Sequence, residues 1–264
     1  MPALQLIGIR QVIGGSIFLF YFLFLKHPFP KGKQWATILV LSILNFMLSN
    51  GFVIWGVKYI SSGLGAIIGA IFPIWVVIIT MFKGSKLPAK AIIGMLMGFG
   101  GVCIIFYDHL ADFLDPGFRF GIILSITASI TWAFGTLYTQ KKADHFNPYY
   151  SLGFQMVLSG IVFLVAAHVS GDVVPVKEIP AESWWAITYL VIIGSGITFV
   201  AYVYALRHLP ASLTSVYAYI NPIIAVLLGA AVLNEKLNGY IALGGAVTII
   251  GVFLVNHSFR KRVV

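Results

Sequence analysis

The side chains best suited to bind a solute are amides, phenols and indoles that stand inside long apolar segments. They are Asn45, Trp132, Gln155, Tyr202, Tyr217 and Asn221. An unpaired polar group is costly in hydrocarbon, so such side chains must face protein or a water-filled cavity. We interpret these six as substrate-binding residues, and helix–helix packing is the alternative for each.

Arg10 is the only Lys, Arg, Asp or Glu that stands clearly inside an apolar segment. A charge at the centre of a membrane helix costs roughly 2.5–3.5 kcal/mol on the insertion scale. Arg10 lies about 9 Å along a helix axis from the start of its segment, so its side chain can also extend to the interface. Two interpretations stay open: a substrate-binding or gating cation, and a structural one.

Pro73 and Pro222 lie near the middle of two apolar segments. A proline removes one backbone hydrogen bond and frees a carbonyl group. Matched interruptions of two helices are a good pointer to the binding site of a transporter. We predict that both prolines act as hinges, and a kink that serves packing is the alternative.

The sequence offers no group of residues suited to catalysis or to a metal. The single cysteine, Cys103, has no base near it at membrane depth, and the six histidines fall at the ends of apolar segments or between them. Neither an HExxH motif nor paired intramembrane aspartates occur. We therefore predict no enzyme, no cofactor and no metal. The lack of an acid within a span favours facilitated movement or exchange over carboxylate-based proton coupling.

The elements that carry these residues are predicted to be membrane helices. Of the 264 residues, 59% are hydrophobic and 9% are charged, against roughly 25% charged in a soluble domain. A helix crosses a bilayer with about 20 apolar residues, and the apolar runs here are continuous rather than alternating. The sequence predicts an all-α polytopic membrane protein with helices at residues 4–25, 34–56, 59–82, 88–107, 119–140, 149–168, 183–205, 210–233 and 237–255.

The net charge of +9 comes mainly from Lys and Arg residues in the loops between these helices and in the C-terminal tail. Alternate gaps and the C-terminal tail hold twelve Lys and Arg, and the remaining gaps hold four. The positive-inside rule then predicts a multi-pass protein of the cell inner (plasma) membrane with a cytoplasmic C-terminus. No basic stripe interleaved with aromatics occurs, so we expect no nucleic acid. The partners expected are a small-molecule solute and the lipid bilayer, and a homodimer is compatible with the sequence.

The chain also repeats itself. A shift of 149 residues superposes Pro73 on Pro222, and nearby shifts superpose Arg10 on Gln155, Gly15 on Gly160, Gly94 on Gly244 and Gly101 on Gly251. Five helices separate matching positions, so the two units have opposite membrane orientations, as in many secondary transporters. We predict an inverted repeat of five-helix units at residues 1–107 and 119–256. The helix at 119–140 has no match, so we expect a further helix before residue 1 and ten in the full-length form; a genuine nine-helix chain is the alternative.

Four segments give the chain its resemblance to the EamA family of drug/metabolite transporters. They are PALQLIGIR at 2–10, SITASITWAFGTLYTQKK at 125–142, AYINPIIAVLLGAAVLNEKL at 218–237 and GGAVTIIGVFLV at 244–255. The resemblance covers nearly the whole chain and implies two inverted units around a cavity that opens alternately to either side. In the first unit KGSKL stands where the second has NEKL, so Ser85 lies opposite Glu235, and a symmetric role for this glutamate is in doubt.

The function that we predict is secondary transport of a small organic metabolite, amino acid or drug-like solute by alternating access. Most members of the family resemble exporters, so export is the expected direction. An aromatic-rich site with one cation and no buried acid favours neutral solutes or zwitterions that carry a carboxylate. The alternative is a non-catalytic membrane scaffold or channel subunit, although no segment resembles a selectivity filter.

Overall fold

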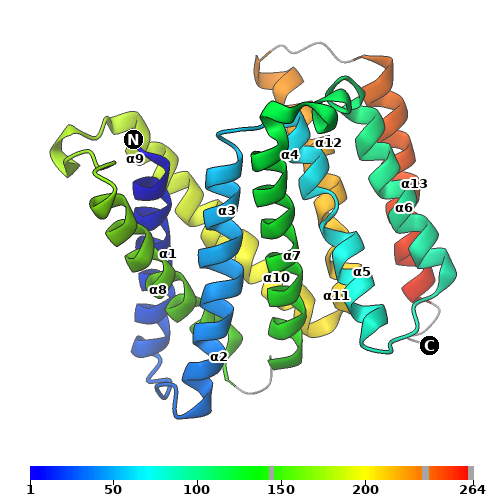
Figure 1. Cartoon of the computed structure of the whole chain (residues 1–264). Coiled ribbons are helices and arrows are strands. Elements are labelled where there is room, and N and C mark those ends of the chain that lie inside the picture. Colours follow the sequence, from blue (N-terminus) through cyan, green and yellow to red (C-terminus); the bar gives the residue numbers. More distant parts are fainter. Residues whose placement is uncertain (143–145, 234–237, 261–264) are drawn as a thin grey trace. The chain divides into compact units, whose positions relative to one another are not determined.

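The computed structural model describes residues 1–142, 146–233 and 238–260. Every regular element in these ranges is a helix (Figure 1). Eight helices of the described chain are long and apolar enough to cross a membrane. A ninth, α6 (Ala89–Ile105), joins them if the short segment bent by 85° from its end is counted with it. The predicted class of an all-α polytopic membrane protein is confirmed, and the inverted repeat stays a prediction. The comparison of Ser85 with Glu235 falls on a position outside the described residues.

The described chain divides into two compact units, each made of two stretches of sequence. Unit 1 comprises Met1–Ile54 and Gly135–His208. Its elements are α1 (Ala3–Phe24), α2 (Lys33–Leu41), the π-helical segment η1 (Ser42–Leu48), most of α3 (Ser49–Gly56), the end of α7 (Arg119–Lys142), α8 (Pro148–Val169), η5 (Val176–Glu178), α9 (Ala181–Tyr189), the π-helical segment η6 (Leu190–Ile197) and α10 (Thr198–His208).

Unit 2 comprises Trp55–Phe134 and Leu209–Val264. After the end of α3 it contains α4 (Ser62–Gly69), α5 (Phe72–Phe82), α6, three short 3-10 turns η2 (Tyr107–His109), η3 (Ala111–Leu114) and η4 (Pro116–Phe118), the start of α7, α11 (Ala211–Thr214), α12 (Tyr217–Leu233) and α13 (Gly239–Arg260). Each unit therefore takes helices from both predicted repeats.

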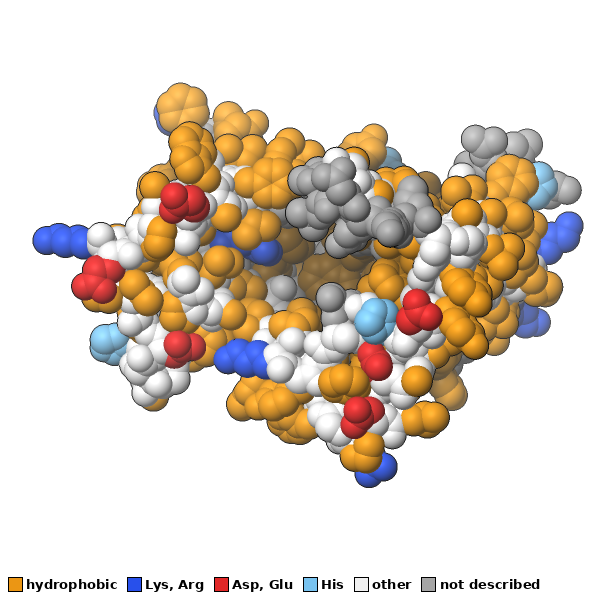
Figure 2. All heavy atoms as spheres, turned by 90° about the horizontal axis from the view of Figure 1, so that it is seen from above, with side chains coloured by type: hydrophobic (Ala, Val, Ile, Leu, Met, Phe, Trp, Pro, Cys, Tyr) orange, Lys and Arg blue, Asp and Glu red, His pale blue; other side chains and the backbone are white. Residues whose placement is uncertain are grey.

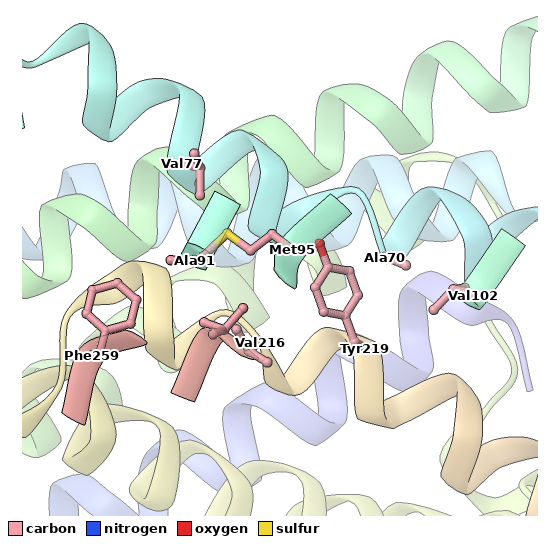
Figure 3. Packing of buried hydrophobic residues seen from close by; sticks show 9 residues of the cluster. Ala70, Val77, Ala91, Met95, Val102, Val216, Tyr219 and Phe259 are labelled. Atoms are coloured by element: carbon pink, nitrogen blue, oxygen red, sulfur yellow. The ribbon is translucent and has the colours of Figure 1, made fainter. Parts of the chain in front are cut away.

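In unit 2, α6 and α13 pack through glycines. A Cβ placed on Gly101 would lie 2.6 Å from the carbonyl oxygen of Gly244, and one placed on Gly94 would lie 2.7 Å from that of Gly251. Such close backbone approach is the usual use of small residues between membrane helices. Around this contact lies an apolar cluster in which Tyr219 and Met95 are almost fully buried (Figure 3).

In unit 1, α1 and α8 pack in the same way. A Cβ on Gly15 would lie 2.8 Å from the carbonyl oxygen of Gly153, and one on Gly160 would lie 3.0 Å from that of Gly8. The sequence pattern Gly65–Gly69, by contrast, marks no close contact, since a Cβ on Gly69 would meet nothing within 4 Å.

The glycine contacts within each unit are reciprocal. In the predicted repeat Gly94 matches Gly244 and Gly101 matches Gly251, and the contacts join Gly94 to Gly251 and Gly101 to Gly244. A two-fold axis between the repeats would produce this exchange of partners. The contacts of α1 with α8 follow the same rule. A shift of 145 residues matches Gly8 with Gly153 and Gly15 with Gly160, and the contacts join Gly8 to Gly160 and Gly15 to Gly153.

The predicted helix at 59–82 is divided in the structure. α4 ends at Gly69, and α5 begins at Phe72, so Pro73 stands at the start of α5. A proline there removes no intrahelical hydrogen bond, because the first N–H groups of a helix have no partner within it. Pro222 differs, since it lies inside α12, which begins after a break that follows α11. The interruption near Pro73 thus precedes the proline instead of being caused by a missing bond.

Two π-helical segments interrupt matching helices of unit 1. η1 covers Ser42–Leu48 and η6 covers Leu190–Ile197, which are the same positions under a shift of 148–149 residues. Polar groups reinforce both: the side-chain amide of Asn50 donates to the carbonyl of Asn45 (3.2 Å), and the Thr198 hydroxyl donates to that of Ile193 (2.8 Å). Short π-helical segments are rare and are frequent at functional sites.

The lysine-bearing loops of unit 1 meet at one end of it. Phe22 from the end of α1 stacks on Tyr150 at the start of α8, with ring centroids 5.3 Å apart, and Trp35 of α2 packs on Phe154 at 5.1 Å. The loop after α1 and the loop after α7 therefore lie at the same end of this unit. The face of the molecule seen in Figure 2 shows acidic side chains, and in the connection between α8 and α9 Asp172 and Glu178 are exposed.

Candidate functional site: polar groups in the membrane spans

The C-terminal part of α7 presents a polar stripe to its neighbours in unit 1. Asn45 of η1 donates from its side-chain amide to the Thr139 hydroxyl (3.4 Å), and the Thr136 hydroxyl shares a short hydrogen bond with the phenol of Tyr202. Gln140 donates to the carbonyl of Leu206 (3.2 Å). Gly135 makes room for Asn45, since any Cβ at this position would overlap the Asn45 amide oxygen. The stripe links both helices that carry π-helical segments.

A second polar stripe runs along α8. The Gln155 amide donates to the Ser151 hydroxyl (2.9 Å), and the Gln155 carbonyl accepts from Ser42 (3.0 Å) and Ser159 (2.8 Å). Ser159 also contacts the amide oxygen of Gln11 on α1. All of these side chains are buried, with Gln155 4% exposed. A connected hydrogen-bond network therefore extends through the interior of unit 1.

Several buried polar atoms of unit 1 have no partner within the described chain. They are Arg10 Nε, Gln11 Nε2, Asn45 Oδ1, Tyr150 Oη and Ser195 Oγ. Asn45 and Ser195 stand 150 residues apart, one in each π-helical segment. Buried polar groups are normally satisfied, so an unpartnered one calls for an explanation, such as a ligand or water.

In unit 2, the predicted aromatic residues form one direct pair. The Trp132 indole donates to the phenol oxygen of Tyr217 (3.2 Å) at the start of α12, and Phe72 of α5 packs on the same ring with centroids 6.0 Å apart. Tyr217 remains 37% exposed. Asn221, one turn further along α12, is exposed.

The structure thus groups the predicted site residues by unit. In unit 1, Asn45 and Tyr202 are held by the stripe on α7, Gln155 belongs to the stripe on α8, and Arg10 is half-buried on α1. In unit 2, Trp132 and Tyr217 form a pair.

Sequence reasoning overlooked several members of these networks. Ser151, Gln155 and Ser159 recur every four residues, and Thr136, Thr139 and Gln140 follow a spacing of three and four. Residues spaced in this way share one face of a helix. Serine and threonine are common in membrane helices, so this spacing alone does not distinguish them as members of a site.

A further polar cluster lies outside the spans of unit 2. Ser61 caps the start of α4, where its hydroxyl accepts from the backbone N–H of Leu64 (3.2 Å) and donates to Asp112 of η3 (2.7 Å). His109 Nδ1 is 3.0 Å from the same carboxylate oxygen, and because a carboxylate can only accept, the ring must donate. These hydrogen bonds, first that of Ser61, hold the pKa of the Asp112 carboxyl below its ordinary value. Ser61 and Asp112 thus tie a connecting segment to the start of α4.

No group of three or more His, Cys, Asp or Glu side chains suited to a metal occurs among the described residues. The chemistry that the described spans offer is hydrogen bonding by amides, hydroxyls and aromatic N–H groups. This set can recognise a polar solute, and no nucleophile is paired with a base within it.

The fold and its buried polar groups define a polytopic α-helical membrane protein of the transporter class. Residues 1–107 and 119–257 match the sequence model of the EamA-like transporter family. The chain belongs to this family.

Relatives of similar length support the assignment. The chain is 27% identical over 256 residues to YedA of Escherichia coli K12, an uncharacterized inner membrane transporter, covering 96% of this chain and 81% of the relative. It is 23% identical to the uncharacterized transporter YoaV of Bacillus subtilis, covering 99% and 90%. A solved crystal structure with 18% identity matches with a TM-score of 0.84 over 97% of this chain and 89% of that one, which shows the shared fold.

Proposed function

We propose that this chain moves a small organic solute across the inner membrane by alternating access, as an exporter with a cytoplasmic C-terminus. The observation that carries the proposal is the set of hydrogen-bonded amides and hydroxyls inside the spans of unit 1, which includes contacts to the two helices with π-helical interruptions. Family membership and the names of the relatives support membrane transport in general.

The residues proposed to contact the solute fall into two sets. Unit 1 supplies Asn45, Gln155, Tyr202 and Arg10, and unit 2 supplies Trp132, Tyr217 and Asn221. Two of the buried atoms without partners in unit 1, Arg10 Nε and Asn45 Oδ1, are a donor and an acceptor that a solute can satisfy. Arg10 would receive a carboxylate through a charge-assisted hydrogen bond.

The elements proposed to move are the interrupted helices of an inverted repeat at residues 1–107 and 119–256. Support comes from the reciprocal glycine contacts and from the matching positions of η1 and η6. Pro73 and Pro222 are the proposed hinges in the second pair of helices. Irregular backbone within the membrane is tolerated where it is buried in protein or lines a cavity.

The test is solute counterflow in proteoliposomes with a panel of labelled amino acids, organic acids and amines. A carrier takes up labelled solute with saturable kinetics, and unlabelled solute on the other side of the membrane stimulates this uptake. A channel or scaffold subunit does not show this stimulation. Y217F removes only the hydroxyl that accepts the hydrogen bond of Trp132. A hydrogen bond is worth about 1 kcal/mol, so we expect KM to rise about fivefold. Y189F, at a ring that is 64% exposed on α9, is the matched control and should transport normally.

A further inference from the structure

An open groove runs along unit 1 between α1 and the helix formed by α9, η6 and α10. Its volume is about 710 Å³, which is within the range of pockets that hold organic ligands. One wall consists of Gly14, Ile17 and Phe18 of α1, and the other extends from Val191 to Tyr204. The second wall therefore covers roughly 20 Å along a helix axis, or most of a membrane span.

Close contacts between the two helices form the floor of the groove. A Cβ on Gly14 would lie 3.1 Å from the Cβ of Ser195, and Phe18 and Phe199 both pack on the apolar cluster that contains Phe46. The contacts advance in the same direction along both helices, from residue 14 to 18 and from 195 to 199. The helices are therefore parallel, and the ends of α1 and α10 lie at the same end of the unit.

The lining of the groove is apolar. Its side chains are hydrocarbon or aromatic, and the phenol of Tyr204 is the one polar group among them. Ile17, Ile192 and Ile197 are 55%, 54% and 60% exposed. A polar solute placed here would leave its hydrogen-bonding groups unsatisfied, which is costly in an apolar environment. The lining thus fits a hydrocarbon chain.

The lysine-bearing end of unit 1 adds positive charge where the groove ends. His208, one turn beyond Tyr204, stacks on the tyrosine ring with centroids 4.2 Å apart, and its Nδ1 donates to the Tyr204 carbonyl (2.8 Å). Arg207 in the last turn of α10 and Lys26 just after α1 are exposed. Basic side chains at the end of a membrane span attract the headgroups of anionic lipids.

We propose that this groove binds one anionic glycerophospholipid. One acyl chain lies along η6 and α10, and the phosphate lies at the end of the groove, beside Arg207 and Lys26. A lipid matches both parts of the surface, because its tail is apolar and its headgroup is charged. The bound chain braces η6 against α1 where the helix is interrupted. The inference does not depend on the proposed transport function.

The experiment measures lipid binding to the purified full chain. The protein is stripped of lipid in neutral detergent and titrated with phosphatidylglycerol or phosphatidylcholine of the same acyl chains, and native mass spectrometry counts the bound molecules. We expect one phosphatidylglycerol to bind saturably and about tenfold more tightly than phosphatidylcholine. R207Q should reduce this preference about fivefold, and R207K should retain it. R119Q removes an exposed charge at the start of α7 and should leave the preference unchanged.

A second pair of variants tests where the acyl chain lies. Ala201 is exposed and lines the groove, so A201F should fill it and weaken the binding of both lipids about tenfold. I193F places the same ring at an exposed position of η6 outside the lining and should bind both lipids normally. Thermal unfolding without lipid checks the fold of both variants. If A201F does not fold, A201L should give a smaller loss of binding in the same direction.

Several results would overturn the proposal. Equal affinity for the two lipids, or equal effects of R207Q and R119Q, would refute the headgroup assignment. Equal effects of A201F and I193F would show that the acyl chain lies elsewhere. Displacement of phosphatidylglycerol by soluble glycerol phosphate would indicate a site for a soluble anion. A change of oligomeric state in A201F with unchanged lipid binding would identify the groove as a contact between copies of the chain.

Discussion

At the scale of residues, Asp112 makes the stability of unit 2 depend on pH. Its pKa is lowered because Ser61 and His109 donate hydrogen bonds to the ionised carboxylate. A carboxyl whose pKa is lower in the folded state stabilises fully above the unfolded pKa, roughly 3.9. This contribution is lost as the pH falls through the folded pKa.

We therefore expect D112N to unfold at a lower temperature than the wild type at pH 7. As the pH falls below the unfolded pKa and through the lowered folded pKa, the difference between the two should shrink, because the wild type then protonates its carboxylate. Thermal unfolding in detergent at a series of pH values measures this. D108N, at an exposed neighbour in η2, is the control, and a pH profile of D112N parallel to that of the wild type would contradict the argument.

Individual side chains could be predicted from the sequence only in part. The polarity of Asn45, Gln155, Trp132 and Tyr217 within apolar runs indicated that they need partners. The identity of the partners could not be read, because Asn45 and Thr139 are 94 positions apart and meet only through packing. The periodicity of residues within one helix shows which of them share a face, but not which other helix that face contacts.

At the scale of elements, the glycine contact of α6 with α13 predicts that alanine has different effects on stability at two adjacent positions. A Cβ on Gly101 would meet the Gly244 carbonyl and the backbone nitrogen of Thr248, both at 2.6 Å, whereas a Cβ on Gly100 would meet nothing within 4 Å. Backbone atoms cannot move aside as a flexible side chain can. G101A should therefore destabilise the chain by about 1–3 kcal/mol.

G100A should be neutral or stabilise by up to about 1 kcal/mol, because alanine has the higher helix propensity. Unfolding of both variants in mixed detergent micelles compares them directly. Equal effects of the two substitutions would show that α6 and α13 are not in backbone contact at Gly101.

The helices were easier to predict than their interruptions. The apolar segments at 4–25 and 149–168 correspond closely to α1 (Ala3–Phe24) and α8 (Pro148–Val169). The π-helical segments could not be foreseen, because hydrophobic runs such as Ser42–Leu48 look alike whether each N–H bonds four or five residues back. The break before α5 was expected at Pro73 itself, and it lies at residues 70–71 because the proline fits a helix start better than a helix interior.

At the scale of the whole molecule, the units defined by packing differ from the repeats read from the sequence. Each unit combines elements from both halves of the chain, such as α1 with α8 and α6 with α13. Sequence comparison finds segments that are alike, whereas packing joins segments that are complementary. The reciprocal glycine contacts connect the two descriptions, since like segments in opposite orientation can meet across a two-fold axis.

Membrane orientation is the remaining prediction, and it can be tested within unit 1. Aromatic contacts place the loops that carry Lys31 and Lys141 at one end of this unit, and the twelve-to-four distribution of Lys and Arg predicts that this end is cytoplasmic. In a C103S background, K31C and K141C should react with a membrane-impermeant maleimide only in inside-out vesicles. D172C, in the connection after α8, should react only in right-side-out vesicles.

The pattern of labelling distinguishes a reversed membrane orientation from an incorrect fold. Labelling of all three positions with the sides exchanged would reverse the orientation and leave the fold intact. Reaction of K31C and K141C from opposite sides would contradict the packing of α1 against α8, because Phe22 and Tyr150 could not then meet. The prediction of an inverted repeat would then also fail, because the glycine contacts between α1 and α8 require the end of α1 and the start of α8 to lie on the same side of the membrane.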